Sequence, residues 1–191
     1  MTRRPFAVLD RDGTIIVEQH YLSDPSGVQL LPGSAIGLGH MHRLGLGLVV
    51  ITNQSAIGRG LIDHKRLQEI HGTMLRLLEE EGVYLDGIYV CPHLPEKNCS
   101  CRKPGTKLLR VAGRELGFEP RRSFVIGDKA CDIELGKRVR ATTFLVRSGY
   151  GEHSASEGGL GQDYTVDDLQ EAATVIERIL GRNFNDHGGE T

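Results

Sequence analysis

Short apolar runs alternate with amphipathic stretches along most of this chain, and this alternation limits the folds that it can adopt. The apolar runs cover residues 6–10, 46–52, 87–91, 123–127 and 142–146. Residues 67–78, 108–116 and 169–180 repeat apolar side chains at the spacing of a helix. Such alternation favours parallel strands that are joined by right-handed crossovers. The sequence therefore predicts an α/β fold with a doubly wound parallel sheet.

Composition supports one globular domain. The 191 residues are 39% hydrophobic and 25% charged, which suffices for a single full core. We expect this domain to cover residues 1–180, with a Gly/Ser-rich loop at 148–162 and a flexible tail at 181–191.

The same numbers argue against nucleic-acid and membrane partners. The formal net charge of −2 gives no support to either kind of binding. No run approaches the roughly 20 apolar residues that span a bilayer, and no long apolar segment precedes the first expected strand. We expect a cytoplasmic protein that binds a small molecule, and a monomer because no apolar stripe is left over.

Two carboxylates follow the first apolar run directly. Residues 6–9 are apolar, Asp10 and Asp12 come next, and Gly13 lets the chain turn away. In an open parallel sheet, ligands bind beyond the carboxyl ends of the strands. Two acids at that place suit a hard divalent cation and acid–base or nucleophilic chemistry.

Other polar side chains stand at comparable places later in the chain. Thr52 ends the second run, and its hydroxyl and the following backbone N–H groups can hold phosphate oxygens. Lys103 supplies a compact positive charge for a phosphoryl group, and its neighbour Arg102 can grip a second anion. Asp128 follows the fourth run and can complete a Mg²⁺ site with Asp10.

Asp132 allows two interpretations. It lies four residues after Asp128, in the first turn of the next expected helix. Its carboxylate could support the metal site, or it could simply be a favourable charge near a helix N-terminus. The sequence leaves both open.

A cysteine cluster directly precedes Arg102. Cys91, His93, Cys99 and Cys101 form a complete tetrahedral ligand set for Zn²⁺ with no open position, so such a site would be structural. In a reducing compartment this clustering favours a metal over disulfides. The zinc loop, residues 91–101, would then fix the position of the cations that follow it. Cys131 lies outside the cluster and is interpreted as a small buried residue at a helix start.

Together these segments resemble the haloacid dehalogenase-type (HAD) phosphohydrolase superfamily, over residues 5–150. The four matching motifs are Asp10-Arg11-Asp12-Gly13-Thr14, Thr52, Lys103 and Gly127-Asp128. The resemblance implies a Rossmann-like core and a Mg²⁺-dependent phosphatase. A non-catalytic zinc-containing binding module is the alternative from another class. It is disfavoured because Asp10, Asp12, Lys103 and Asp128 are all present.

The resemblance also implies a role for each motif residue. Asp10 would be the nucleophile that forms an aspartyl-phosphate, and Asp12 would be the general acid and base. Thr52 and Lys103 would bind the phosphoryl oxygens. Asp10, the backbone carbonyl of Asp12 and Asp128 would hold Mg²⁺. Cations are needed there because an anionic nucleophile must approach an anionic phosphate.

Members of this superfamily usually insert a cap domain after the first or the second motif. The segments 15–51 and 56–101 are too short for a cap once a helix, a strand and the zinc loop are placed in them. We therefore expect a capless, open cleft whose specificity comes from loops. The expected substrate-binding residues are Glu18, Gln19, His20, Tyr21, Asn53, Gln54, Ser55, Arg59, Arg102 and Lys129.

Two capless families with such a zinc loop are similar to the chain. Residues 52–60, 86–89 and 146–149 resemble the D-glycero-D-manno-heptose-1,7-bisphosphate 7-phosphatases. Arg59, Arg102, Lys129 and Arg147 offer more cations than one phosphate needs, although Arg59 and Arg147 also suit ordinary loop solubility. Residues 91–95 and 105–109 are closer to the histidinol-phosphatases. Histidinol phosphate and other sugar or polyol phosphates therefore stay open as alternatives.

Overall fold

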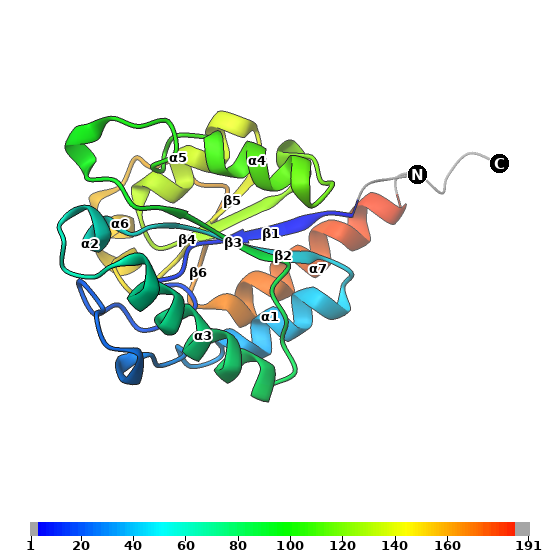
Figure 1. The fold of residues 1–191 in the computed structure, drawn as a ribbon. Coiled ribbons are helices and arrows are strands. Elements are labelled where there is room, and N and C mark those ends of the chain that lie inside the picture. Colours follow the sequence, from blue (N-terminus) through cyan, green and yellow to red (C-terminus); the bar gives the residue numbers. More distant parts are fainter. Residues whose placement is uncertain (1–3, 186–191) are drawn as a thin grey trace.

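A computed structural model describes residues 4–185 of the chain (Figure 1). Its strands are β1 (Phe6–Leu9), β2 (Gly47–Asn53), β3 (Gly87–Cys91), β4 (Phe124–Gly127), β5 (Thr142–Val146) and β6 (Tyr164–Val166). Its helices are α1 (Ser34–Arg43), α2 (Ser55–Gly58), α3 (His64–Glu80), α4 (Lys107–Glu115), α5 (Ala130–Val139), α6 (Gly151–Glu157) and α7 (Leu169–Asn185). Single 3₁₀ turns lie at η1 (Pro25–Gly27), η2 (Pro95–Lys97) and η3 (Pro120–Arg122).

The six strands form one parallel sheet in the order β3-β2-β1-β4-β5-β6. The prediction of a doubly wound parallel sheet is confirmed. The chain order changes direction on either side of β1, which pairs with β2 on one edge and with β4 on the other. Such a switch point opens a crevice beyond the carboxyl ends of the strands.

Each face of the sheet has its own apolar core. Side chains alternate along β1, so Ala7 and Leu9 join one core while Phe6 and Val8 join the other. Helices α1, α3 and α7 cover the first core, and α4 and α5 cover the second (Figure 1). Burial on both faces explains why the strands read as continuous apolar runs in the sequence.

The predicted loop at residues 148–162 is wrong in part, because this segment contains α6. This helix carries no apolar stripe: its buried members are Gly151 and Ser154, and the Ser154 hydroxyl donates to the Asp128 carbonyl oxygen at 3.0 Å. A Cβ on Gly151 would lie only 1.6 Å from the Val146 carbonyl oxygen, so glycine allows α6 to begin directly against the end of β5. The spacing of apolar residues therefore could not predict helix α6.

Two further boundaries differ from the sequence prediction. The short edge strand β6 was not foreseen. Helix α7 continues to Asn185, beyond the expected start of the tail at residue 181, and residues 186–191 lie outside the described part. Between Thr14 and β2 the structure has only η1 and α1, and between β2 and β3 only α2 and α3, so these described segments contain no cap domain. Within residues 4–185, no helix is both long and apolar enough to traverse a lipid bilayer.

Candidate active site

A buried lysine and two carboxylates meet where β1 ends. Asp10 follows β1, and its backbone N–H donates to the Ile126 carbonyl oxygen of β4 at 3.0 Å. Lys103 Nζ lies 2.7 Å from Asp10 Oδ1 and 2.7 Å from Asp132 Oδ1, and all three side chains are buried. Burial lowers the pKa of Lys103, but the charges of Asp10 and Asp132 outweigh this effect and raise it. Lys103 is therefore a permanent cation beside Asp10.

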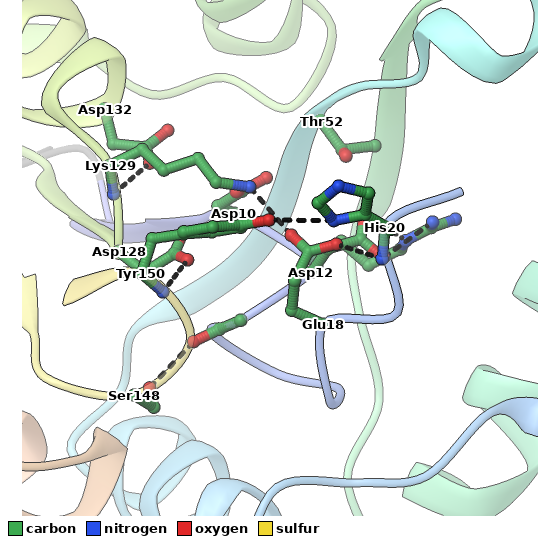
Figure 2. Close-up of polar contacts among 12 residues, drawn as sticks. Asp10, Asp12, Glu18, His20, Thr52, Asp128, Lys129, Asp132, Ser148 and Tyr150 are labelled. Atoms are coloured by element: carbon green, nitrogen blue, oxygen red, sulfur yellow. Dashed lines mark hydrogen bonds and ion pairs between the residues drawn. The ribbon is translucent and has the colours of Figure 1, made fainter. Parts of the chain in front are cut away.

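Asp128 adds a third carboxylate to this group. Oxygen atoms of Asp10, Asp128 and Asp132 lie within 4.8 Å of one another. The Asp128 Oδ2 atom accepts the Tyr150 N–H at 2.9 Å (Figure 2), whereas its buried Oδ1 atom has no protein partner. Burial raises the pKa of Asp128 to about 7, and the nearby charge of Asp10 adds to the rise. An unpaired carboxylate oxygen beside two other acids is the kind of oxygen site that a divalent cation satisfies.

The Asp12 carboxylate is held from two sides. Arg11 grips it with two N–H groups, Nε to Oδ2 at 3.0 Å and NH2 to Oδ1 at 2.8 Å. The Gln54 amide donates to Asp12 Oδ2 and to Thr52 Oγ1, each at 2.7 Å. Burial raises the pKa of Asp12, but the Arg11 charge and these hydrogen bonds outweigh it and hold the pKa below its usual value. These contacts favour the ionised form of Asp12 and fix the direction of its carboxyl group.

Asn53 fixes the backbone of Lys103. Its Oδ1 atom accepts the Lys103 N–H at 2.9 Å, and its Nδ2 atom donates to the Lys103 carbonyl oxygen at 3.2 Å. The end of β2 is thereby tied to the segment that follows the zinc loop. Binding of substrate by Asn53 stays a prediction; in the structure its amide holds the Lys103 backbone in place.

The side chains of Cys91, His93, Cys99 and Cys101 converge in the zinc loop. The Cys101 Sγ atom lies 3.3 Å from Cys91 Sγ, 3.2 Å from Cys99 Sγ and 3.2 Å from His93 Nδ1. Four mutually close sulfur and nitrogen atoms match the donor set of a closed tetrahedral metal site. The Arg102 NH1 atom donates to the His93 carbonyl oxygen at 3.2 Å, so this cluster also touches the cation beside Lys103.

A cleft of about 320 Å³ is lined by Asp10, Asp12, Thr52 and Lys103. Across its mouth, Lys129 Nζ lies 2.8 Å from Glu18 Oε2 and 4.6 Å from the centre of the Tyr150 ring. The Tyr150 hydroxyl lies 3.0 Å from His20 Nδ1 (Figure 2). Two loops that are remote in sequence, after β1 and after β5, therefore meet at the rim of the cleft.

Known proteins share this arrangement of sequence and fold. The HAD-hydrolase-like family model matches residues 100–172. The D-glycero-beta-D-manno-heptose-1,7-bisphosphate 7-phosphatase of Photorhabdus laumondii is 37% identical, over 80% of this chain and 86% of its own. The Helicobacter pylori enzyme of the same name is 40% identical, over 72% of this chain and 80% of its own. The D,D-heptose 1,7-bisphosphate phosphatase of B. bronchiseptica, solved with magnesium and phosphate, has a TM-score of 0.85 at 30% identity and covers 91% of this chain and 98% of its own.

The chain belongs to this heptose-bisphosphate 7-phosphatase family. It is a phosphatase with a HAD core, and the family resemblance that the sequence motifs indicated is confirmed. The relative from B. bronchiseptica was solved with magnesium. In this phosphatase, Asp10 after β1, Asp128 after β4 and Asp132 in the first turn of α5 form an acidic group that suits the same ion.

Most of the predicted site residues of the phosphatase line its cleft. The lining includes Asp10, Asp12, Glu18, His20, Tyr21, Thr52, Asn53, Gln54, Ser55, Arg102, Lys103 and Lys129. Gln19 and Arg59 are not among the lining residues: the Gln19 amide donates to the Gly27 carbonyl oxygen at 2.7 Å, and Arg59 lies over the Tyr21 ring at 5.5 Å. Arg147 pairs with Glu152 and Asp167 and also lies outside the lining, as expected of a surface arginine.

Three residues that sequence reasoning did not assign to the phosphatase site are Arg11, Tyr150 and Cys131, which all line the cleft. Arg11 lies inside the first motif, where no role was assigned to it. Tyr150 stands between two glycines, a context that usually indicates only a turn. Cys131 does lie at a helix start, as interpreted, but it is partly exposed to the cleft.

Proposed function

We propose that this phosphatase removes the 7-phosphate of D-glycero-D-manno-heptose 1,7-bisphosphate by way of an aspartyl-phosphate on Asp10. The observation that carries the proposal is the position of Asp10 between a permanent cation, Lys103, and the unpaired oxygen of Asp128. Lys103 places one positive charge beside Asp10, and a divalent cation held by Asp10 and Asp128 would add a second, so that this carboxylate could approach an anionic phosphate.

We propose that Asp10, Asp128 and the backbone carbonyl of Asp12 hold Mg²⁺, which when bound neutralises charge on the phosphoryl group and orients it. The buried, unpartnered Asp128 Oδ1 atom supports this assignment. Asp132 belongs to the same acidic group, yet its contact with Lys103 gives it a different task, which is to hold the lysine.

In the first step, an Asp10 carboxylate oxygen attacks phosphorus and the bond from phosphorus to the C7 oxygen breaks. Protonated Asp12 gives its proton to that leaving oxygen, which departs as an alcohol. Thr52 and Lys103 bind the transferring phosphoryl oxygens; the ammonium of Lys103 has three N–H groups and only two carboxylate contacts, so it retains donor capacity.

In the second step, a water oxygen attacks phosphorus and the bond from phosphorus to Asp10 breaks. The Asp12 carboxylate accepts the proton of the water, so the acid of the first step becomes the base of the second. Inorganic phosphate leaves, and both carboxyl groups return to their starting states. The hold of Arg11 and Gln54 on Asp12 supports the ionised form that this second step uses.

A second phosphate has a cation available in the cleft. Lys103 is neutralised by Asp10 and Asp132, and Lys129 is paired with Glu18. Arg102 donates to a backbone carbonyl oxygen, with no carboxylate partner among residues 4–185. A guanidinium with unused donors suits bidentate binding of the phosphate that is not hydrolysed.

We propose that the ion of the cysteine cluster is Zn²⁺ and that its function is structural. Three sulfur atoms and one imidazole nitrogen leave no open position for substrate. The bond from Arg102 to His93 supports a role in placing Arg102 and Lys103. Free thiols in this arrangement also favour a reducing compartment, and we infer a cytoplasmic location from them.

We infer that the protein acts as a monomer. The exposed large apolar side chains that the structure describes are scattered over separate elements: Tyr21, Ile36, Leu61, Leu75 and Tyr84. Light scattering at two protein concentrations tests this inference, and a stable dimer would contradict it.

The test of the proposed function compares the bisphosphate with histidinol phosphate in the presence of Mg²⁺. We expect a higher kcat/KM for the bisphosphate, and no turnover of either compound by Asp10→Asn. Arg102→Ala should lower kcat/KM for the bisphosphate more than for a simple monophosphate. Equal losses of kcat/KM for the bisphosphate and the monophosphate would count against the second-phosphate site. A preference for histidinol phosphate would count against the heptose bisphosphate as the substrate.

A further inference from the structure

Arg11 is a buried cation that the steps above do not use directly. Only 1% of its surface is exposed. Its Nε and NH2 groups both point at the neighbouring carboxylate of Asp12, at 3.0 and 2.8 Å. Burying a charge is costly unless it is paired, and here the charge serves one carboxylate. The two parallel N–H bonds also fix the plane of that carboxylate, which a single bond would leave free to rotate.

The remaining guanidinium nitrogen of Arg11, NH1, is buried and has no hydrogen-bond partner among residues 4–185. Within the described residues, the hydrogen bonds of this guanidinium are therefore confined to Asp12.

We propose that Arg11 is a positioning residue that aims the Asp12 carboxyl group at the leaving oxygen. The inference rests on the role of Asp12 in the proposed function. Gln54 completes the hold on the other side of the carboxylate by its bond to Oδ2.

The proposal predicts a dependence on the leaving group. Asp12 matters in the first step only when the departing oxygen needs a proton. Nitrophenolate is a stable anion and departs without one, whereas phenolate, whose acid ionises near pH 10 as tyrosine does, gains much more from protonation. A misdirected Asp12 should therefore slow hydrolysis of phenyl phosphate more than that of p-nitrophenyl phosphate. Both are monophosphates of similar size, so the comparison does not depend on the identity of the natural sugar.

The experiment measures kcat/KM for these two aryl phosphates in Arg11→Met, Arg11→Lys and, as a reference, Asp12→Asn. We expect the ratio of the kcat/KM for phenyl phosphate to that for p-nitrophenyl phosphate to fall at least tenfold in Arg11→Met and less in Arg11→Lys, in the range seen for residues that orient a functional group. Ile70→Val, a buried change next to His71 in α3, should leave the ratio unchanged.

The outcomes separate the inference from the proposed function. If Asp12→Asn lowers the ratio but Arg11→Met and Arg11→Lys lower kcat/KM equally for both substrates, the positioning role is wrong. If Asp12→Asn itself leaves the ratio unchanged, the acid role in the proposed function is wrong, and the inference fails with it. Arg11→Lys keeps a buried cation, so this variant still decides the question if Arg11→Met does not fold.

Discussion

Lys103 Nζ lies 2.7 Å from Asp132 Oδ1, in a contact where each side chain is 2% exposed. This contact bears on both interpretations of Asp132, because the carboxylate faces Lys103, the lysine that we propose to bind the phosphoryl group. Its Oδ2 atom also accepts the Lys129 N–H at 3.1 Å, so it caps the start of α5 at the same time. Asp132 is therefore both a helix cap and a support of the active site.

Removal of the Asp132 charge should destabilise the protein and disturb Lys103. We expect Asp132→Asn to lower the free energy of unfolding by about 3 kcal/mol, since it leaves a buried ammonium with one carboxylate fewer. The kcat/KM should fall as well. Urea denaturation and a phosphatase assay measure the two effects.

The matched control is Glu134→Gln on the same helix. Glu134 pairs with Arg138, but both side chains are about half exposed. Such a surface pair contributes less than about 1 kcal/mol. If Asp132→Asn lowers the free energy of unfolding no more than Glu134→Gln does, the buried contact between Lys103 and Asp132 does not stabilise the fold.

Gly149 should be needed for metal binding and not only for the turn that it makes. Its φ is +57°, and a Cβ there would lie 2.4 Å from Asp128 Oδ2. Gly82 has φ +73° with no atom within 4 Å of its Cβ position. Both alanine variants should lose about 1 kcal/mol from the backbone, but only Gly149→Ala should displace Asp128.

We therefore expect Gly149→Ala to need at least tenfold more Mg²⁺ for half-maximal activity, in the range reported for displaced metal-site residues. Gly82→Ala should respond to Mg²⁺ as the unmodified protein does. The measurement is a Mg²⁺ titration of activity for all three proteins. Identical titration curves for the two variants would show that the Asp128 carboxylate tolerates the added methyl group.

Loss of the zinc-loop metal should impair catalysis even when Mg²⁺ is present. The cluster contacts Arg102 through the His93 carbonyl, and Lys103 follows in the chain. We expect protein that has been treated with a strong chelator and resupplied with Mg²⁺ alone to stay at least tenfold less active. Addition of Zn²⁺ together with Mg²⁺ should restore it. Full activity of a preparation that elemental analysis finds free of zinc would refute this structural role.

The sequence predicted those parts of the site that follow directly from a strand end. Asp10, Thr52 and Asp128 each come at or just after an apolar run, and parallel strands bring such positions to one edge of the sheet. The zinc loop was also predictable in its membership, because its four ligands lie within eleven consecutive residues.

Interactions that depend on side-chain direction were not predictable. Gln54 and Asn53 are adjacent and both polar, yet one bonds Asp12 and Thr52 while the other holds the Lys103 backbone. Only the turn from β2 into α2 separates their directions. Tyr150 reaches the cleft because α6 begins abruptly after β5, and a segment with no apolar stripe gave no sign of that helix.

His71 should make the protein sensitive to mild acid. Burial, the largest cause, and the Arg11 charge together lower the pKa of His71 from 6.5 to about 4, while the Asp12 charge opposes the shift. The unfolded chain therefore binds this proton at a higher pH than the folded protein does. The stability that neutral His71 contributes is complete above pH 6.5 and is lost as the pH falls from 6.5 toward 4. The loss amounts to about 3 kcal/mol at the acid end of that window.

Urea denaturation at pH 7 and at pH 4.5 measures this effect. His71→Gln removes the titrating ring, so its drop in unfolding free energy between the two pH values should be smaller than that of the unmodified protein by about 2 kcal/mol. Ile70→Val destabilises the same helix without removing a titrating group and should keep the full drop. If His71→Gln and Ile70→Val lose stability equally on acidification, the ring accepts its proton as readily in the folded protein as in the unfolded chain, and the lowering of its pKa by burial would be wrong.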